Sequence, residues 1–242
     1  MKLLLENWRK YLKEDTEPYP YQIYCDMDGV LVDFEVAVVD QINADIVDES
    51  IQTEEMLALR KAMARTDRPT WGKEAAAGPM KISKYDINKD IQPRPELIQA
   101  ARNYMYANFK NNQEFWGRLP WMEDGKELWN YIKGYNPIIL TTPMGEPSKT
   151  NEELTPSEIG KTLWVETHLG KGIEIIFSNK KYEKATTTGT PNGTPNVLID
   201  DFSTNTEPWL IAGGFAILHT NFKDTKADLE YIATIPREKS AT

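Results

Sequence analysis

Residues 21–33 have the sequence Tyr-Gln-Ile-Tyr-Cys-Asp-Met-Asp-Gly-Val-Leu-Val-Asp. The apolar and aromatic run over 21–25 predicts a short buried strand, which ends at Asp26. Asp28-Gly29 then breaks the strand, and Gly29 permits the turn and the close backbone approach that such a loop needs. From Asp33 to Ile46 the apolar residues recur at helical spacing. We therefore expect a buried strand that ends in two carboxylates and leads into a helix.

Strands and helices alternate in the second half of the chain. Apolar runs predict strands over 137–142, 173–178, 196–200 and 215–219, and helical patterns cover 155–169, 207–212 and 224–232. Alternating elements with apolar strands are typical of a parallel sheet covered by helices. The sequence thus predicts an α/β fold with a Rossmann-like parallel sheet flanked by helices. The predicted core domain comprises residues 21–34 and 135–242.

A long insertion without a convincing strand separates the first two predicted strands. Its helix-forming segments are 54–65, 95–109, 113–119 and 124–133. Residues 66–93 are mixed polar, glycine and proline residues and predict irregular structure. We interpret residues 35–134 as a helical cap inserted into the core domain. Residues 1–20 form an amphipathic leader followed by a polar linker with two prolines.

Composition and charge exclude several classes of protein. The chain has 242 residues, a net charge of −9 and one cysteine, Cys25, so an intrachain disulfide and a cysteine-rich zinc site are excluded. The acidic balance makes polynucleotide binding unlikely, because phosphate backbones repel such a surface. No apolar run is long enough for a membrane span, and the N-terminus does not resemble a secretory signal. These features favour a cytoplasmic protein.

Reactive side chains follow the predicted strands at the point where each strand ends. Because the carboxyl ends of parallel strands meet at one edge of a sheet, we expect these side chains to lie close together. Carboxylates, hydroxyls and ammonium groups at one edge predict a phosphate site with a metal ion. The residues are Asp26 and Asp28, Thr141 and Thr142, Lys180 and Lys181, and Asp200 and Asp201.

Each group has a distinct chemical use at such a site. A carboxylate can attack phosphorus and form an aspartyl-phosphate, and a second carboxylate two residues later can act as acid and then as base. Mg²⁺ prefers carboxylate and carbonyl oxygens, and it would reduce the repulsion between an anionic nucleophile and an anionic ester. Asp201, with Asp200, would complete the ligand set. Thr141 and a lysine would donate to the phosphate oxygens.

The order of these motifs resembles the haloacid dehalogenase superfamily of phosphohydrolases. The finer pattern is similar to its 5′(3′)-deoxyribonucleotidase branch, and the resemblance covers about residues 21 to 220. The motifs are Asp26-x-Asp28-Gly-Val-Leu-x-Asp33, Phe115-Trp116-x-x-Leu119-Pro120, Leu140-Thr141-Thr142-Pro143, Lys161-x-x-Trp164-Val165-Glu166-x-x-x-Gly170 and Leu198-Ile199-Asp200-Asp201. The resemblance implies a Mg²⁺-dependent phosphomonoesterase with a helical cap between the first two catalytic motifs.

Roles follow from the resemblance by motif position. Asp26 would be the nucleophile and Asp28 the acid/base. The ion would bind the Asp26 side chain, the Asp28 backbone carbonyl and Asp201, and Thr141 with Thr142 would bind phosphate. The motif lysine is Lys180 or Lys181, of which we favour Lys181, and Lys161 is a third candidate.

The resemblance also suggests a substrate. The branch stacks a nucleobase on aromatic residues of the cap, and the cap here contains Trp71, Phe115, Trp116 and Trp121. A ribonucleoside or deoxyribonucleoside monophosphate is therefore the expected substrate. A sugar phosphate or a nucleic-acid end is the alternative.

The leader has two interpretations. It is a helix that packs on the body or frays, or it is a docking helix for a partner. Its sequence Leu-Leu-Glu-Asn-Trp-Arg-Lys-Tyr-Leu resembles N-terminal leaders on proteins of T4-like tailed bacteriophages. That resemblance implies a viral enzyme acting in the host cytoplasm, or a phage-associated binding protein whose leader carries the function.

Overall fold

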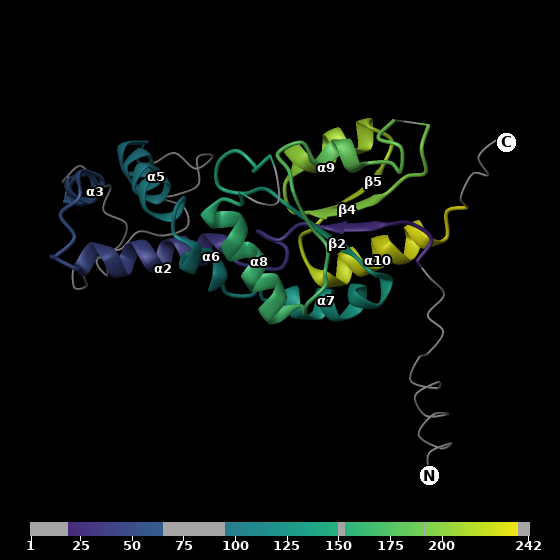
Figure 1. Cartoon of the computed structure of the whole chain (residues 1–242), viewed down its shortest axis with the longest axis horizontal. Helices are drawn as coiled ribbons and strands as arrows, with labels where there is room; N and C mark the ends of the chain where they lie inside the picture. Colours follow the sequence, from purple (N-terminus) through teal and green to yellow (C-terminus); the bar gives the residue numbers. More distant parts are fainter. Residues whose placement is uncertain (1–18, 65–94, 150–152, 191, 237–242) are drawn as a thin grey trace, which may run out of the picture.

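The computed structural model describes residues 19–64, 95–149, 153–190 and 192–236. Five parallel strands form one sheet in the order β3-β2-β1-β4-β5, as Figure 1 shows in part. The strands are β1 (Ile23–Cys25), β2 (Ile138–Thr141), β3 (Ile175–Phe177), β4 (Val197–Asp200) and β5 (Phe215–Leu218). The predicted α/β fold with a parallel sheet is confirmed.

The two faces of the sheet have separate apolar cores, because side chains alternate along a strand. On one face Ile23 and Cys25 are fully buried with Ile199, under α7 (Gly125–Ile132) and α10 (Phe222–Ala233). On the other face Tyr24 packs edge-on against Trp209 of α9 (Ser203–Ile211), with ring centroids 5.5 Å apart. Figure 1 shows α9 and α10 on opposite sides of the strands. The helices therefore cover both faces, as expected for apolar strands.

Helix α9 begins at Ser203, four residues before the predicted start at 207. Ser203–Thr206 are residues that favour turns and caps, and Pro208 favours the first turn of a helix, so the pattern indicated a later start. In the structure, the carbonyl of Phe202 accepts the N–H groups of Asn205 and Thr206. The first turn is thus formed by polar residues that lie before the predicted start of the helix.

The remaining helices lie on the carboxyl side of the strands. They are α2 (Phe34–Val47), α3 (Glu54–Ala64), α5 (Pro95–Phe109), α6 (Gln113–Gly117) and α8 (Pro156–His168), and two 3-10 turns cover Lys133–Tyr135 and Lys181–Lys184. In Figure 1, α3 and α5 lie beside α2 on the side away from the strands. Among the described residues, none of the helices is both long and apolar enough to cross a membrane.

Helix α7 falls within the predicted cap range but packs with the core. The ring of Tyr131 lies edge-on to Phe222 of α10, with centroids 5.8 Å apart, and Leu128 and Ile132 join the core beneath β1. The leader and Trp71 lie outside the described residues. The boundary at 134 stays a prediction.

Helices α6 and α8 approach each other closely at Gly160. A Cβ atom there would collide with the backbone oxygen of Gln113 and with the side chain of Trp116. The indole of Trp164, one turn further along α8, donates to the carbonyl of Leu119 at 2.8 Å. Close packing at Gly160 therefore fixes the position of α8 against α6. Lys161, the next residue of α8, is fixed with it.

Candidate active site

The loop after β1 is folded tightly on itself. The carbonyl of Met27 accepts the N–H groups of Leu31 and Val32 at 2.8 and 2.9 Å, and Gly29 donates to Val32 at 2.8 Å. Gly29 has φ = 73°, in the left-handed region that favours glycine. A Cβ atom at Gly29 would also overlap the carboxylate of Asp201. Gly29 is therefore the residue that lets the β1 loop and the end of β4 meet.

Asp26, Lys181 and Asp200 form a buried chain of charges. The ammonium group of Lys181 lies 2.8 Å from Asp26 Oδ2 and 2.6 Å from Asp200 Oδ2. All three residues are at least 90% buried. Burial would lower the pKa of Lys181, but the charges of Asp26 and Asp200 outweigh it, and the pKa is raised. Lys181 is therefore a cation held between two carboxylates.

The hydrogen bonds of Asp200 occupy both of its oxygens. Oδ1 accepts the N–H of Phe202 at 2.9 Å and Nδ2 of Asn205 at 3.0 Å, while Oδ2 accepts Lys181 and Asn205. A carboxylate has about four acceptor positions. Asp200 is therefore arranged to hold Lys181, and the metal role predicted for it stays a prediction.

Oxygen atoms near the end of β1 remain without a partner. Asp26 Oδ1 and Asp28 Oδ1 are buried and have no hydrogen-bond partner within the described part of the chain. One carboxylate oxygen each from Asp26, Asp200 and Asp201 lie within 4.8 Å of one another. Unpaired buried carboxylate oxygens are costly unless a cation binds them. A hard cation such as Mg²⁺ fits this donor set.

Lys161 holds Asp28 and the end of β2 together. Its ammonium group donates to Asp28 Oδ2 at 2.6 Å, to Thr141 Oγ1 at 2.9 Å and to the carbonyl of Thr142 at 2.7 Å. The side chain is fully buried and lies over the ring of Trp116, 5.1 Å from its centroid. Three acceptors use all three donors of the ammonium group. Lys161 therefore orients these residues and is not free to bind a phosphate directly.

The three candidate lysines are placed differently. Lys161 and Lys181 are both buried at the site, on opposite sides of the Asp26–Asp28 pair. The Lys180 side chain is 61% exposed, and its ammonium group lies 4.0 Å from Glu183. Lys180 therefore lies outside the group of charged residues at the site. The predicted phosphate-binding residue Thr142 lines the cavity of the site, and its hydroxyl donates to the carbonyl of Ser178 at 2.9 Å.

Three carboxyl groups of the site, those of Asp28, Asp200 and Asp201, have raised pKa values. Burial is the main cause of the raised pKa of Asp28; the charge of Asp26 adds to it and Lys161 opposes it. Asp201 is exposed at the protein surface, but partial desolvation of its carboxyl by neighbouring atoms, with the charges of Asp26 and Asp200, raises the pKa of Asp201 to about 7. Without a bound cation, the four carboxyl groups of the site carry more negative charge than Lys161 and Lys181 neutralise.

A cavity of about 440 Å³ opens beside these groups. It lies between the strand ends, the first turn of α2 and the start of α9. Its lining includes Asp26, Asp28, Lys181 and Asp201, and also Phe34, Val36, Met122, Phe202 and Asn205. Sequence analysis missed the latter five. Their signal was adjacency to a catalytic motif, since Phe34 follows Asp33 directly and Phe202 follows Asp201.

The predicted base-stacking residues are not in this cavity. Phe115 is 9% exposed and Trp116 2% exposed. Phe115 stacks on Phe109 at 4.3 Å, Trp116 stacks on Phe34 at 5.3 Å, and its indole donates to the carbonyl of Phe109. Trp121 packs against Trp164 at 4.8 Å. Phe115 and Trp116 are packed inside the protein, and this arrangement does not present them to a ligand; Trp121 is half-buried and does not line the cavity.

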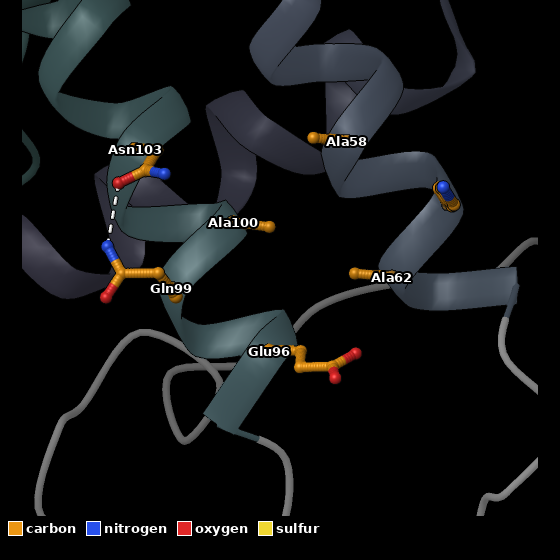
Figure 2. A pocket seen from close by; sticks show the side chains of 7 residues that line it. Ala58, Ala62, Glu96, Gln99, Ala100 and Asn103 are labelled. Carbon is orange, nitrogen blue, oxygen red and sulfur yellow. Dashed lines mark hydrogen bonds between the residues drawn. The ribbon is translucent and has the colours of Figure 1, made fainter.

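A second cavity, of about 540 Å³, lies between α3 and α5 (Figure 2). Alanine side chains face it from both helices, and Gln99 donates to Asn103 at its edge at 2.8 Å. Its charged lining residues are Lys61 and Glu96. None of the predicted catalytic residues lines it, so the smaller cavity is the candidate active site.

Comparisons with known proteins give the following result. No protein-family model matches the chain, and no curated protein matches it. Among solved structures, a hydrolase from Streptococcus pneumoniae TIGR4 has a TM-score of 0.42 and 12% identity, covering 87% of this chain and 98% of its own. A HAD family hydrolase from Deinococcus radiodurans R1 with bound phosphate and sodium has a TM-score of 0.37 and 17% identity, covering 89% of both chains. A phosphonoacetaldehyde hydrolase-like protein from Oleispira antarctica has a TM-score of 0.39 and 12% identity, covering 89% and 82%. At these TM-scores and identities the function has to be inferred from the site itself.

Proposed function

We propose that this protein is a phosphomonoesterase of the haloacid dehalogenase type, with Asp26 as nucleophile. The observation that carries the proposal is the environment of Asp26. One of its oxygens is paired with Lys181 at 2.8 Å, and the other is buried, has no partner among the residues that the structure describes, and belongs to a carboxylate that is clustered with Asp200 and Asp201. A purely structural carboxylate would have its second oxygen hydrogen-bonded. This one is arranged to react with, or to bind, a group that enters the cavity.

The reaction needs two displacements at phosphorus. In the first, a carboxylate oxygen of Asp26 forms a bond to phosphorus while the ester P–O bond breaks, and Asp28 gives its proton to the departing oxygen. In the second, water attacks the aspartyl-phosphate, Asp28 takes the proton from that water, and phosphate leaves with Asp26 restored. The raised pKa of Asp28 supports its role, because a general acid must hold a proton at working pH.

The proposed metal ion is Mg²⁺, held by the Asp26 side chain, the Asp28 backbone carbonyl and Asp201. When bound, it would offset the repulsion between the carboxylates and a dianionic ester. The lysines contribute separately. Lys181 donates to Asp26 and lines the cavity, so it can also contact phosphate, whereas Lys161 keeps Asp28 and Thr141 in place. Asp200 keeps Lys181 in place.

The proposed substrate is a nucleoside monophosphate. A cavity of about 440 Å³ with aromatic and aliphatic side chains on its wall suits an ester larger than a small polyol phosphate. The motif order that resembles the deoxyribonucleotidase branch favours the same substrate. The net charge of −9 counts against a nucleic-acid end. The paired lysines and carboxylates count against a protein that retains the fold only to bind a partner.

A phosphate-release assay tests the proposal directly. We expect Mg²⁺-dependent release from nucleoside monophosphates, loss of release in EDTA, and loss of turnover in Asp26→Asn with an unchanged circular dichroism spectrum. Asp228→Asn is the matched control, because Asp228 is exposed on α10. Turnover that survives in Asp26→Asn would exclude the mechanism. Release from sugar phosphates alone would keep the mechanism and exclude the proposed substrate.

A further inference from the structure

Two large apolar side chains are exposed in the wall of the catalytic cavity. Phe202 is 47% exposed and Val36 is 40% exposed, and both line the cavity that contains Asp26 and Lys181. Those two charged residues are only 6% and 3% exposed. The charged groups therefore form the buried end of the cavity, and the apolar pair lies nearer its mouth.

Both apolar residues are held by carboxylates through their backbones. The N–H of Phe202 donates to Asp200 Oδ1 at 2.9 Å, and the N–H of Val36 donates to Asp33 Oδ1 at 2.9 Å. Phe202 also accepts two N–H groups of α9 at its carbonyl. Each residue thus belongs to the start of a helix whose position is fixed. The exposure of the Phe202 and Val36 side chains therefore follows from the fixed positions of their backbones.

The position of Phe202 is coupled to the reacting groups. Asp200 binds Phe202 with one oxygen and Lys181 with the other, and Lys181 binds Asp26. The nearby polar side chain, Asn205, uses its amide nitrogen on Asp200. The wall on this side therefore presents an aromatic ring at a set position relative to the nucleophile.

An ester that places its phosphate at Asp26 has its leaving group at this wall. We propose that Phe202 and Val36 form the leaving-group wall of the active site, and that the wall selects esters carrying a planar heteroaromatic ring, as in a nucleoside monophosphate, over bare sugar phosphates. This inference rests on the proposed phosphatase function. It assigns recognition of the ring to α2 and α9, in place of the buried Phe115 and Trp116.

The test compares two esters that differ only in the ring. Deoxythymidine 5′-monophosphate and 2-deoxyribose 5-phosphate are both primary alkyl esters, so the chemical step is the same. We expect Phe202→Ala to lower the ratio of kcat/KM for the nucleotide over the sugar phosphate about tenfold, since an aromatic ring stacked on a base contributes that much or more. Phe202→Tyr should restore the ratio. Leu210→Ala is the control, because Leu210 is exposed on the same helix and lies outside the cavity.

Several results would overturn the inference. A ratio that stays within twofold in Phe202→Ala would do so, and so would an equal loss for both esters, which would mean that Phe202 acts only through Asp200. If the wild-type protein hydrolyses neither ester, the phosphatase function itself fails. The affinity for deoxythymidine 5′-monophosphate, measured by calorimetry, then tests the leaving-group wall separately. Weaker binding by Phe202→Ala than by the wild type supports the wall, and equal affinities or no binding by the wild type overturn it.

Discussion

Lys161 and Lys181 are two buried cations at the candidate active site, and their contacts give them different roles. Lys181 lies between Asp26 and Asp200, and it is also part of the cavity lining. Lys161 is fully buried, and its three hydrogen bonds end on Asp28, Thr141 and the backbone. A cation with all donors occupied fixes the position of its acceptors. The two lysines are therefore expected to fail in different ways when each is replaced.

We expect Lys161→Met to lower kcat about 100-fold, because the variant keeps the volume of the side chain but releases Asp28 from its reacting position. KM should change much less, since Lys161 does not contact the ligand. Steady-state kinetics on the best nucleotide substrate would measure both. Lys180→Met is the control, because that side chain is exposed and outside the cluster. A rise in KM with unchanged kcat would show that Lys161 binds substrate instead.

Sequence analysis identified the residues at the strand ends but not their partners. Asp26, Thr141 and Asp201 follow or end apolar strands, and the parallel sheet brings them together for that reason. Which lysine each acid would meet depends on how α8 and the turn at Lys181–Lys184 pack, and spacing along the chain carries no such information. The signal for Phe202 was only its position after Asp201, and an exposed aromatic residue after a strand is common.

One side chain of α3 joins that helix to the end of α2. Arg60 of α3 donates to four backbone carbonyls around the end of α2: Asp45 at 3.3 Å, Ile46 at 3.0 Å, Asp48 at 2.6 Å and Ile51 at 2.7 Å. The last carbonyls of a helix have no partner within the helix. One guanidinium group therefore closes the α2 terminus and fixes the turn into α3.

We expect Arg60→Ala to lower the free energy of local opening of α3 by about 2 kcal/mol, since hydrogen bonds to charged groups contribute roughly 1.5–3 kcal/mol each to stability when buried and these are only partly so. Amide hydrogen exchange would measure this for α3, with the amides of β1 as an internal reference. Lys61→Ala, at the exposed neighbouring position, should leave the exchange of α3 unchanged. Equal acceleration in α3 and β1 would contradict a local role.

The helices and strands were largely predictable from the sequence, whereas the residues at which they begin and end were less so. Strand β4 was found because its residues are apolar up to Asp200, and α8 was found from its helical pattern over 155–169; the structure adds a capping box at Thr155 and Glu158. The start of α9 was missed because Ser203–Thr206 favour caps and turns when considered alone. The N–H groups of Asn205 and Thr206 donate to the carbonyl of Phe202, and the N–H of Phe202 donates to Asp200, an arrangement that only the folded β4–α9 junction supplies.

Three distant parts of the chain meet at His219, which directly follows β5. Its Nδ1 lies 2.8 Å from Thr225 Oγ1 in the first turn of α10, and its Nε2 lies 3.7 Å from Asp124 Oδ1 at the start of α7. Asp124 also accepts the N–H of Phe222. The sequence indicated a structural histidine but not these contacts, since Asp124 and His219 are far apart along the chain. The site links the packing of α7, β5 and α10.

Protonation of His219 should therefore act on the stability of the whole fold. Burial lowers the pKa of His219, and the charge of Asp124 only partly offsets this. In the unfolded chain the imidazole has its ordinary pKa of about 6.5. As the pH falls below that value, His219 becomes protonated in the unfolded state but not in the folded state. The free energy of unfolding therefore falls until the pH reaches the lowered pKa of His219 in the folded state.

His219→Asn tests this sign, because an amide can keep the bond to Thr225 and does not titrate. Urea unfolding at pH 7.5, 6.5 and 5.5 gives the free energy of unfolding of each protein. We expect the stability of the wild type relative to the variant to decrease by about 1 kcal/mol between pH 7 and 5.5. The chain has two histidines, and His168 is common to both proteins, so its titration cancels in the difference. A difference that is constant with pH would mean that His219 takes up its proton equally in the folded and unfolded states, and that its burial does not keep it neutral.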